Sequence, residues 1–256
     1  MDCLIANEFD GILSLRLNRP EKHNALNAEL LAALHQAFLD AKERHSVKAI
    51  LLIGNGKSFC AGADINRLAE CNAQSGYDFA KAGQDIFNAL ESMGKPSLAA
   101  VHGHILGGGC ELAMSAHLRM AHRESYFGQP EVKLGVIPGY GGTQRLCRLV
   151  GRARAIDICI SGRLIDAQTA CQWGLANWVV EDNLEQQAMD YLKQLVKLPE
   201  LAIRGAIDSI LLGGDMSMTQ GLELEALQFA KTCASADKQE GVMAFLEKRQ
   251  PQFKGC

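Results

Sequence analysis

The alternation of strand-like and helix-like apolar patterns constrains the fold of this chain more than any other feature of its sequence. Over residues 12–18 apolar and polar residues alternate, as in a strand that buries one face. After Asn27, a favoured N-cap residue, apolar residues recur every three or four positions, as on the buried stripe of a helix. Residues 49–53 are uniformly apolar and precede Gly54, which indicates a strand buried on both faces. Strand, helix and strand in this order predict an α/β layer architecture.

The same alternation returns once before the pattern changes. A strand is expected at residues 97–101, a helix at about 108–116 and a further strand at about 118–121. Beyond about Gln144 the sequence has the spacing of helices joined by short connections. The last three helices are expected at residues 184–197, 216–231 and 238–248.

The C-terminal part of the chain carries more apolar surface than a terminal hairpin usually hides. The segment after Gly213 is rich in Leu, Ala, Met and Phe at helical spacing. We therefore divide the chain into a core at residues 1–195 and a helical region at residues 196–256, which we expect to pack at a subunit interface.

The composition is that of an ordinary globular protein and excludes several classes of partner. Of the 256 residues, 48% are apolar and 21% are charged, so a packed core is expected. Lys and Arg number 26 against 29 Asp and Glu, and a net charge of -3 provides no broad basic field for nucleic acid or an anionic membrane. The cysteines are nine, an odd number, without metal-ligand spacing, and we interpret them as free thiols in a reducing cytoplasm. No signal peptide or membrane-spanning stretch is recognisable.

Three glycine-containing clusters place glycine beside ionisable groups. They are SFCAGADI at 58–65, HILGGGCEL at 104–112 and FGQPEVKLGVIPGYGGTQRL at 127–146. The triple glycine lies between a strand and a helix, where the first amides of the helix have no internal partner and can bind an anion. It is equally compatible with a tight turn that allows close helix–sheet packing. Neither a dinucleotide-binding nor a P-loop spacing is present.

Two glutamates stand out beside these glycines. Glu111 falls in the first turn of the expected helix, where the helix dipole alone could account for a carboxylate. Its neighbours are almost all apolar, however, which indicates a buried carboxylate with a partner or a task. Glu131 follows Pro130 and precedes several glycines, which favours a shaped loop, and by spacing alone it is compatible with an ordinary surface residue.

Taken together, the clusters resemble those of the crotonase, or enoyl-CoA hydratase/isomerase, family. The resemblance runs from about Leu13 to Arg249 and is closest to enoyl-CoA hydratases. Its motifs, in order, are NRPEKHNAL at 18–26, CAGADI at 60–65, GGGCEL at 107–112, the long cluster at 127–146 and ISGRLIDAQTACQWGL at 160–175.

The resemblance implies a fold, an activity and a site. The fold is a spiral of ββα units followed by a helical trimerisation region, so a homotrimer or a hexamer made of two trimers is expected. The implied reaction is reversible addition of water to a trans-2-enoyl-CoA, giving a 3-hydroxyacyl-CoA, in β-oxidation of fatty acids or related acyl-CoA catabolism. By the same likeness the N–H groups of Ala63 and Gly108 bind the thioester oxygen, Glu111 acts chiefly as the base, and Glu131 protonates C2. No metal ion or redox cofactor is needed in this interpretation, and coenzyme A arrives as part of the substrate.

Contacts with the CoA moiety and competing activities are also implied by the resemblance. The positions that match the CoA-binding and substrate-binding positions are Lys22, Ala25, Ala61, Asp64, Ile65, Asn66 and Tyr140. Asn66 replaces a lysine found in many hydratases, so a phosphate contact is either missing or supplied by Arg67, and Tyr140 either narrows the acyl pocket or caps its loop. Double-bond isomerisation and 3-hydroxyacyl-CoA hydrolysis are the nearest alternatives, and a non-catalytic scaffold or RNA-binding protein is a more distant one.

Overall fold

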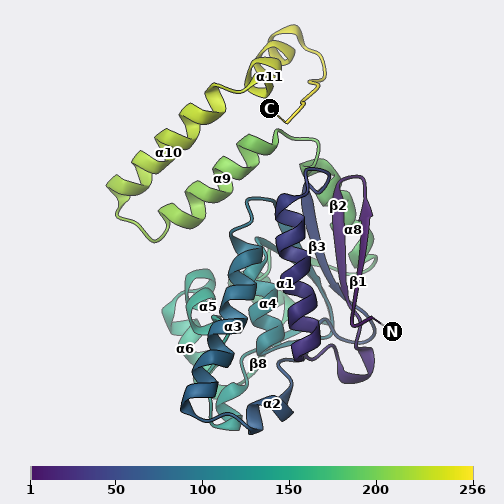
Figure 1. Ribbon diagram of the computed structural model, residues 1–256, viewed down its shortest axis with the longest axis vertical. Coiled ribbons are helices and arrows are strands. Elements are labelled where there is room, and N and C mark those ends of the chain that lie inside the picture. Colours follow the sequence, from purple (N-terminus) through teal and green to yellow (C-terminus); the bar gives the residue numbers. More distant parts are fainter. Residues whose placement is uncertain (1, 256) are drawn as a thin grey trace.

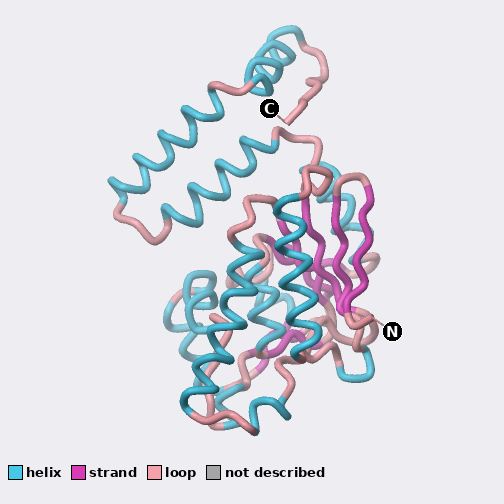
Figure 2. The backbone as a smooth tube through the Cα atoms, viewed as in Figure 1, coloured by secondary structure: helices cyan, strands magenta, loops and turns pink. Residues whose placement is uncertain are grey.

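The structure, a computed structural model, describes residues 2–255, with the exception of the side chains at positions 66 and 67. Its main sheet has six strands in the order β1-β2-β3-β4-β6-β9. The strands β1, β2 and β3 are labelled in Figure 1, and Figure 2 shows strands in magenta. The strands are β1 Leu4–Phe9, β2 Ile12–Leu17, β3 Ala49–Gly54, β4 Ser97–Val101, β6 Leu118–His122 and β9 Trp178–Val180. Among the described strands of this sheet, β1 and β2 pair antiparallel and the other neighbours pair in parallel. The expected α/β architecture is confirmed.

A smaller sheet lies beside the main one. It contains β5 His104–Leu106, β7 Tyr126–Gly128 and β8 Leu164–Asp166, in that order. The strands β4 and β5 and then the helix α4 form one ββα unit, and β6 and β7 begin the next. Because each unit passes from the large sheet to the small one, the loops that follow β5 and β7 end close together, with β5 and β7 paired in parallel.

Helices cover both faces of the main sheet. The helices up to residue 195 are α1 Ala28–Glu43, α2 Ile65–Ala69, α3 Ala73–Glu91, α4 Gly108–Ser115, α5 Gly142–Val150, α6 Arg152–Ser161, α7 Ala167–Gln172 and α8 Leu184–Leu195, with short 3-10 turns η1 Pro20–Lys22 and η2 Glu131–Leu134. Asn27 caps α1 as expected, since its side chain accepts from the N–H of Leu30.

The alternation of side chains along the strands produces two apolar cores. Leu13, Leu15, Ile50 and Leu52 pack in the larger core with residues of α1, α3 and α4. The intervening residues, such as Leu51, pack with α8 on the other face. Every residue of β3 is buried, which confirms a strand covered on both faces.

Three long helices at the C-terminus project from this core (Figure 1). They are α9 Glu200–Gly213, α10 Met218–Cys233 and α11 Ala236–Glu247. Helix α8 ends at Leu195, where the sequence suggested a boundary, and the division into two folding units stays a prediction. Among the described residues, no helix combines the length and apolar composition that a membrane crossing requires.

The expectation of helices alone beyond Gln144 is wrong. Strands β8 and β9 lie in that part of the chain and complete the small and the large sheet. Each has only three residues, which is too short for an alternating pattern to be recognised. The long helix α3 also has no counterpart among the expected elements, because Gly76 and Gly83 interrupt its apolar stripe.

Candidate active site

The first part of the site is the loop around Ala63, which is fixed by backbone hydrogen bonds. The N–H of Leu26 donates to the carbonyl of Gly62 (2.8 Å), and the N–H of Asp64 donates to the carbonyl of Leu26 (3.0 Å). Ala63 lies between these bonds, and within residues 2–255 its own N–H donates to no backbone acceptor. The loop therefore presents one unused donor at a fixed position.

The three glycines at the start of α4 are required for different structural reasons. Gly107 has a φ of 50°, a conformation that favours glycine. A Cβ at Gly109 would lie 2.1 Å from the carbonyl oxygen of Cys60, so this glycine permits close packing. Gly108 begins α4, and a Cβ there would lie 3.2 Å from the nitrogen of Ala63. The turn-and-packing interpretation thus holds for Gly107 and Gly109, while Gly108 places the start of a helix beside the Ala63 amide.

Glu111 is buried in the first turn of α4, with 2% of its surface exposed. Its Oε1 accepts from the N–H of Tyr140 (2.8 Å) and from the N–H of Gly142 (2.6 Å). Gly142 is the first residue of α5, so the N-terminus of a second helix is directed at this carboxylate. Burial first, and then the charge of Glu131, raises the pKa of Glu111 to about 8.

Glu131 is the first residue of the 3-10 turn η2, consistent with the shaped loop expected there. Burial raises the pKa of its carboxyl to about 7. Gln129 is fully buried. With its side-chain amide oriented so that the nitrogen faces Glu131, this nitrogen donates to the two carboxylate oxygens (3.0 and 3.1 Å). A Cβ at Gly142 would meet both the Gln129 amide (3.0 Å) and Oε1 of Glu111 (2.8 Å), so this amide lies close to Glu111 as well as to Glu131.

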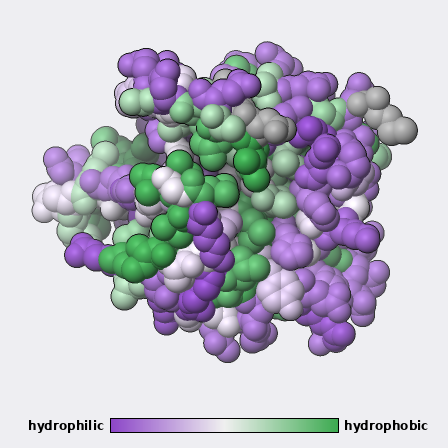
Figure 3. Space-filling view, turned by 90° about the horizontal axis from the view of Figure 1, so that it is seen from below, coloured by the Kyte–Doolittle hydropathy of each residue, from purple (hydrophilic) through white to green (hydrophobic). Residues whose placement is uncertain are grey.

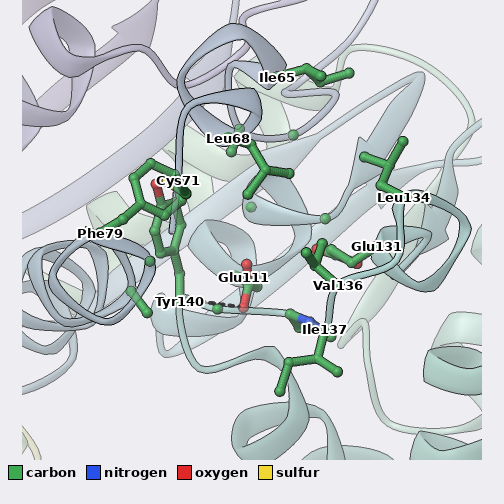
Figure 4. Close-up of a pocket in the computed structure, with 18 of the residues that line it drawn as sticks. Ile65, Leu68, Cys71, Phe79, Glu111, Glu131, Leu134, Val136, Ile137 and Tyr140 are labelled. Atoms are coloured by element: carbon green, nitrogen blue, oxygen red, sulfur yellow. Dashed lines mark hydrogen bonds between the residues drawn. The ribbon is translucent and has the colours of Figure 1, made fainter. Parts of the chain in front are cut away.

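These groups surround one cavity of about 690 Å³, shown in Figure 4. Ala63, Gly108, Glu111 and Glu131 all line it. The other lining side chains are mostly apolar, and in Figure 4 Leu68, Phe79, Leu134, Val136 and Ile137 surround the two carboxylates. Figure 3 shows hydrophobic side chains gathered on this end of the molecule, which is seen from below. The cavity offers two acids, unused amides and apolar walls to a single ligand.

The two glutamates titrate near neutral pH as a pair. With pKa values raised to about 8 and about 7, the pair holds about one proton between pH 7 and 8. One carboxylate and one carboxylic acid are therefore present together, with the proton favoured on Glu111, whose pKa is the higher. An acid beside a base is the requirement for concerted acid–base chemistry.

The positions expected to contact CoA divide into two groups. Ala61, Ile65 and Tyr140 line the cavity, together with the four residues above. Lys22, Ala25 and Asp64 are not among the lining residues, although Asp64 is tied to Arg19 (4.0 Å) in the same region. The side chain of Asn66 lies outside the described residues, as does that of Arg67.

Two residues that contact the site, Gln129 and Arg145, were not predicted from the sequence. Gln129 touches Glu131, and Arg145 donates to the carbonyl of Tyr140 (3.0 Å), directly behind the amides that bind Glu111. Both belong to the cluster at 127–146, so their positions beside Glu131 and Gly142 were the available signal. A buried Gln or Arg cannot be distinguished from an exposed one by spacing alone.

Free thiols were expected and are found. The eight cysteines that the structure describes are all unbridged, and Cys256 lies outside the described residues. In the described part of the chain, no three His, Cys, Asp or Glu side chains gather as a metal site would need.

Comparison with known proteins agrees with this geometry. The sequence matches the enoyl-CoA hydratase/isomerase family over residues 7–256. It is 39% identical to a short-chain-enoyl-CoA hydratase of Clostridium acetobutylicum, over 96% of this chain and 95% of the relative. It is 37% identical to a crotonyl-CoA hydratase of Syntrophomonas wolfei, over 98% and 97%. The crystal structure of an enoyl-CoA hydratase from Bacillus anthracis superposes with a TM-score of 0.95 at 32% identity, covering 99% of this chain and all of the other.

The chain therefore belongs to the enoyl-CoA hydratase/isomerase, or crotonase, family, and its fold is the crotonase fold. The resemblance identified from the five motifs is confirmed.

Proposed function

We propose that the protein is an enoyl-CoA hydratase, a hydro-lyase that adds water reversibly to a trans-2-enoyl-CoA to give a 3-hydroxyacyl-CoA. The observation that carries the proposal is the pair formed by buried Glu111 and half-buried Glu131, which line one apolar cavity beside the amides of Ala63 and Gly108. The names of the relatives, which include crotonyl-CoA and short-chain-enoyl-CoA hydratases, support the same reaction.

The amides would act on the thioester carbonyl. The N–H groups of Ala63 and Gly108 donate to its oxygen, where negative charge develops as water attacks C3. A donor placed for this charge is worth about 3 kcal/mol in comparable sites. Support comes from the unused Ala63 donor and from the position of Gly108 at the start of α4, where helix amides lack internal partners.

The glutamates would move the protons. Glu111 removes a proton from water as its oxygen bonds to C3, and Glu131 delivers a proton to C2, so one water is added in total. Glu111 then holds one proton and Glu131 holds none, and transfer between them restores the starting state. These steps use the form of the pair in which Glu131 carries the single proton. Because the pKa of Glu111 is the higher of the two, this form is in equilibrium with a more populated form that carries the proton on Glu111.

No metal ion or redox cofactor is required for this chemistry, because the two carboxylates and the two amides provide the acid, the base and the oxyanion stabilisation. Coenzyme A enters as part of the substrate. We propose that Ala61 and Ile65, at the cavity, and Lys22, Ala25, Asp64 and Asn66, nearby in the chain, border the CoA moiety.

Tyr140 would set the size of the acyl group. A Cβ at Gly83 would lie 2.1 Å from the Tyr140 ring, so this glycine lets the ring pack against α3. The ring also lies 5.0 Å from that of Phe79 and 5.5 Å from that of Phe87, measured between centroids. This packed aromatic wall beside Gly108 favours a short acyl chain, as in the short-chain relatives.

The C-terminal helices would form a subunit interface. Leu222, Phe229 and Phe245 expose 56%, 69% and 83% of their surfaces. Soluble monomers rarely expose large apolar side chains together in this way. We propose a homotrimer or a hexamer of two trimers, working in a reducing compartment such as the cytoplasm, which the free thiols support.

The reaction is tested by following loss of the conjugated-thioester absorbance of crotonyl-CoA and of 2-enoyl-CoAs with longer chains. We expect turnover of crotonyl-CoA and a falling kcat/KM as the chain lengthens. Absence of hydration with all these thioesters would contradict the proposal. Migration of a double bond in 3-enoyl-CoA without hydration would assign the protein to the isomerases instead.

A further inference from the structure

Arg145 is a buried cation that the proposed reaction does not use. It lies in the first turns of α5, with 9% of its surface exposed. Its guanidinium donates from Nη1 to the carbonyl of Tyr140 (3.0 Å), from Nη2 to Oδ1 of Asn88 (2.7 Å), and from Nη2 and Nε to Oε2 of Glu91 (2.7 and 3.1 Å). Asn88 and Glu91 belong to α3, so the guanidinium joins α3 to the turn that precedes α5.

That turn is the one that binds Glu111. The peptide group between Tyr140 and Gly141, whose carbonyl accepts from Arg145, is flanked on both sides by the peptides whose N–H groups donate to Glu111. Arg145 and Glu111 therefore hold the same three peptides through different groups. Displacing the middle peptide would move both donors of Glu111.

Gly141 shows that the turn is shaped around the guanidinium. Its φ is 106°, a conformation that side chains disfavour, and a Cβ there would lie 2.3 Å from Nη1 of Arg145. A second side chain of α3, Gln84, donates to the carbonyl of Gly139 (2.9 Å). The turn is thus tied to α3 at two successive carbonyls.

We propose that Arg145 is a positioning residue of the active site, which holds the Tyr140–Gly142 turn in the shape that directs two amides at Glu111. The inference rests on the proposed hydration, in which Glu111 is the base. An ion pair with Glu91 alone would explain a stable contact between α3 and α5. It does not explain the bond to Tyr140, which ties the guanidinium to the turn that binds the carboxylate.

Electrostatics acts in the same direction as geometry. Glu131, from η2, opposes ionisation of Glu111, whereas Arg145 and the amides of Tyr140 and Gly142 favour it. The thiols of Cys110, its neighbour on α4, and of Cys159, from α6, also sense Glu111, and both have raised pKa values and are neutral. Removing Arg145 should therefore raise the pKa of Glu111 further.

The test measures the protonation of Glu111 directly. The infrared carboxyl band that disappears in Glu111→Gln is titrated in the full-length wild-type protein and in Arg145→Met, Arg145→Lys and Arg148→Met. Arg148 is the matched control, because it lies on the same helix with a side chain 58% exposed and paired with Asp215. We expect the midpoint to rise by about one pH unit in Arg145→Met, a tenfold change in acid dissociation, by less in Arg145→Lys, and not at all in Arg148→Met.

Kinetics with crotonyl-CoA supply a second readout. We expect kcat to fall by about tenfold or more in Arg145→Met with little change in KM. The basic limb of the pH profile, where the glutamate pair loses its last proton, should move with the infrared midpoint. An unchanged midpoint in folded Arg145→Met refutes the proposal, and if that variant does not fold, an unchanged midpoint in Arg145→Lys does so. A wild-type protein that does not hydrate crotonyl-CoA would contradict the proposed function instead, since the infrared titration needs no turnover.

Discussion

Helices α1 and α10 have the same length of 16 residues and comparable N-caps, but opposite surroundings. Asn27 caps α1 and Ser217 caps α10, each accepting from a backbone N–H of the first turn. Helix α1 buries five of its residues against the sheet and α3, whereas α10 buries none. Local signals thus produce the helix in both cases. What differs is whether the apolar stripe is covered within the chain itself.

The contrast extends to the two regions that contain these helices. The core up to residue 195 is closely packed around its cavity. At several of its glycines, a single added methyl group would collide with a neighbouring atom. In the C-terminal helices, some glycines leave more room. A Cβ at Gly205, for example, would meet its nearest neighbour at an ordinary 3.6 Å. The core should therefore be sensitive to small steric changes that the helical region tolerates.

The largest effect is expected from a β-branched side chain at Gly108. Gly108→Val would fill the space next to Leu26 and Tyr140 and displace the amide, so we expect hydration to fall by about a thousandfold or more. Steady-state kinetics with crotonyl-CoA measure the loss, and circular dichroism checks the fold. Gly205→Ala, a control substitution at a glycine of α9, should leave turnover within about twofold of wild type. Near-normal activity of folded Gly108→Val would show that the oxyanion site lies elsewhere.

The next largest effect should come from the two carboxylates. Glu111→Gln and Glu131→Gln should each slow hydration by about a hundredfold, the usual scale of general acid–base assistance, with modest changes in KM. Because both act on one water and one proton transfer, the double variant should be much less than multiplicatively slower.

Exchange of the C2 proton with deuterium distinguishes the roles of the two glutamates. If Glu111→Gln left hydration untouched while Glu131→Gln abolished the exchange, a one-base isomerase mechanism would replace the proposed one.

Elements whose pattern is visible within a few residues could be predicted from the sequence, whereas elements that depend on distant parts of the chain could not. Helix α1 and strands β2, β3 and β4 were predictable, because their apolar period is visible within a few residues. Strands β8 and β9 were not, because three residues pair only when distant strands are already in place.

In the site, Glu111, Glu131, Ala63 and Gly108 were found through motifs, and the structure places all four at one cavity. Gln129 and Arg145 were missed because their partners are side chains and carbonyls of other elements. No spacing reveals such contacts.

A smaller effect is expected on assembly. Leu222→Asp and Phe229→Asp would each place a charge within the apolar stripe of α10, and losing one buried side chain of this size costs about 2 kcal/mol, or roughly thirtyfold in association. Light scattering at micromolar concentration should show smaller particles than for wild type, with α-helical content retained. Glu223→Gln, on the same helix, is the control. A wild-type protein that is already monomeric would show that α10 has another partner or none.

The smallest effect concerns the stability cost of the buried carboxylate. The pKa of Glu111 is about 8 in the folded protein against an ordinary 4.5, so between these pH values the folded state binds more protons than the unfolded state. The free energy of unfolding therefore falls as pH rises from about 4.5 to about 8, and the loss is complete above that range. Glu111→Gln removes this loss while its amide oxygen can still accept from Tyr140 and Gly142.

Each unit of the raised pKa corresponds to about 1.4 kcal/mol, so the stabilisation by Glu111→Gln should be greater at pH 9 than at pH 4 by at least that amount. Denaturant titrations at the two pH values measure the difference. Asp157→Asn, at an exposed ion pair with Arg163, should show no such gain at high pH, because the pKa of Asp157 is lowered by its hydrogen bond with that arginine. Equal effects of Glu111→Gln at both pH values would mean that the carboxylate is solvated in the folded protein, and that the active site is as open to water as the C-terminal helices.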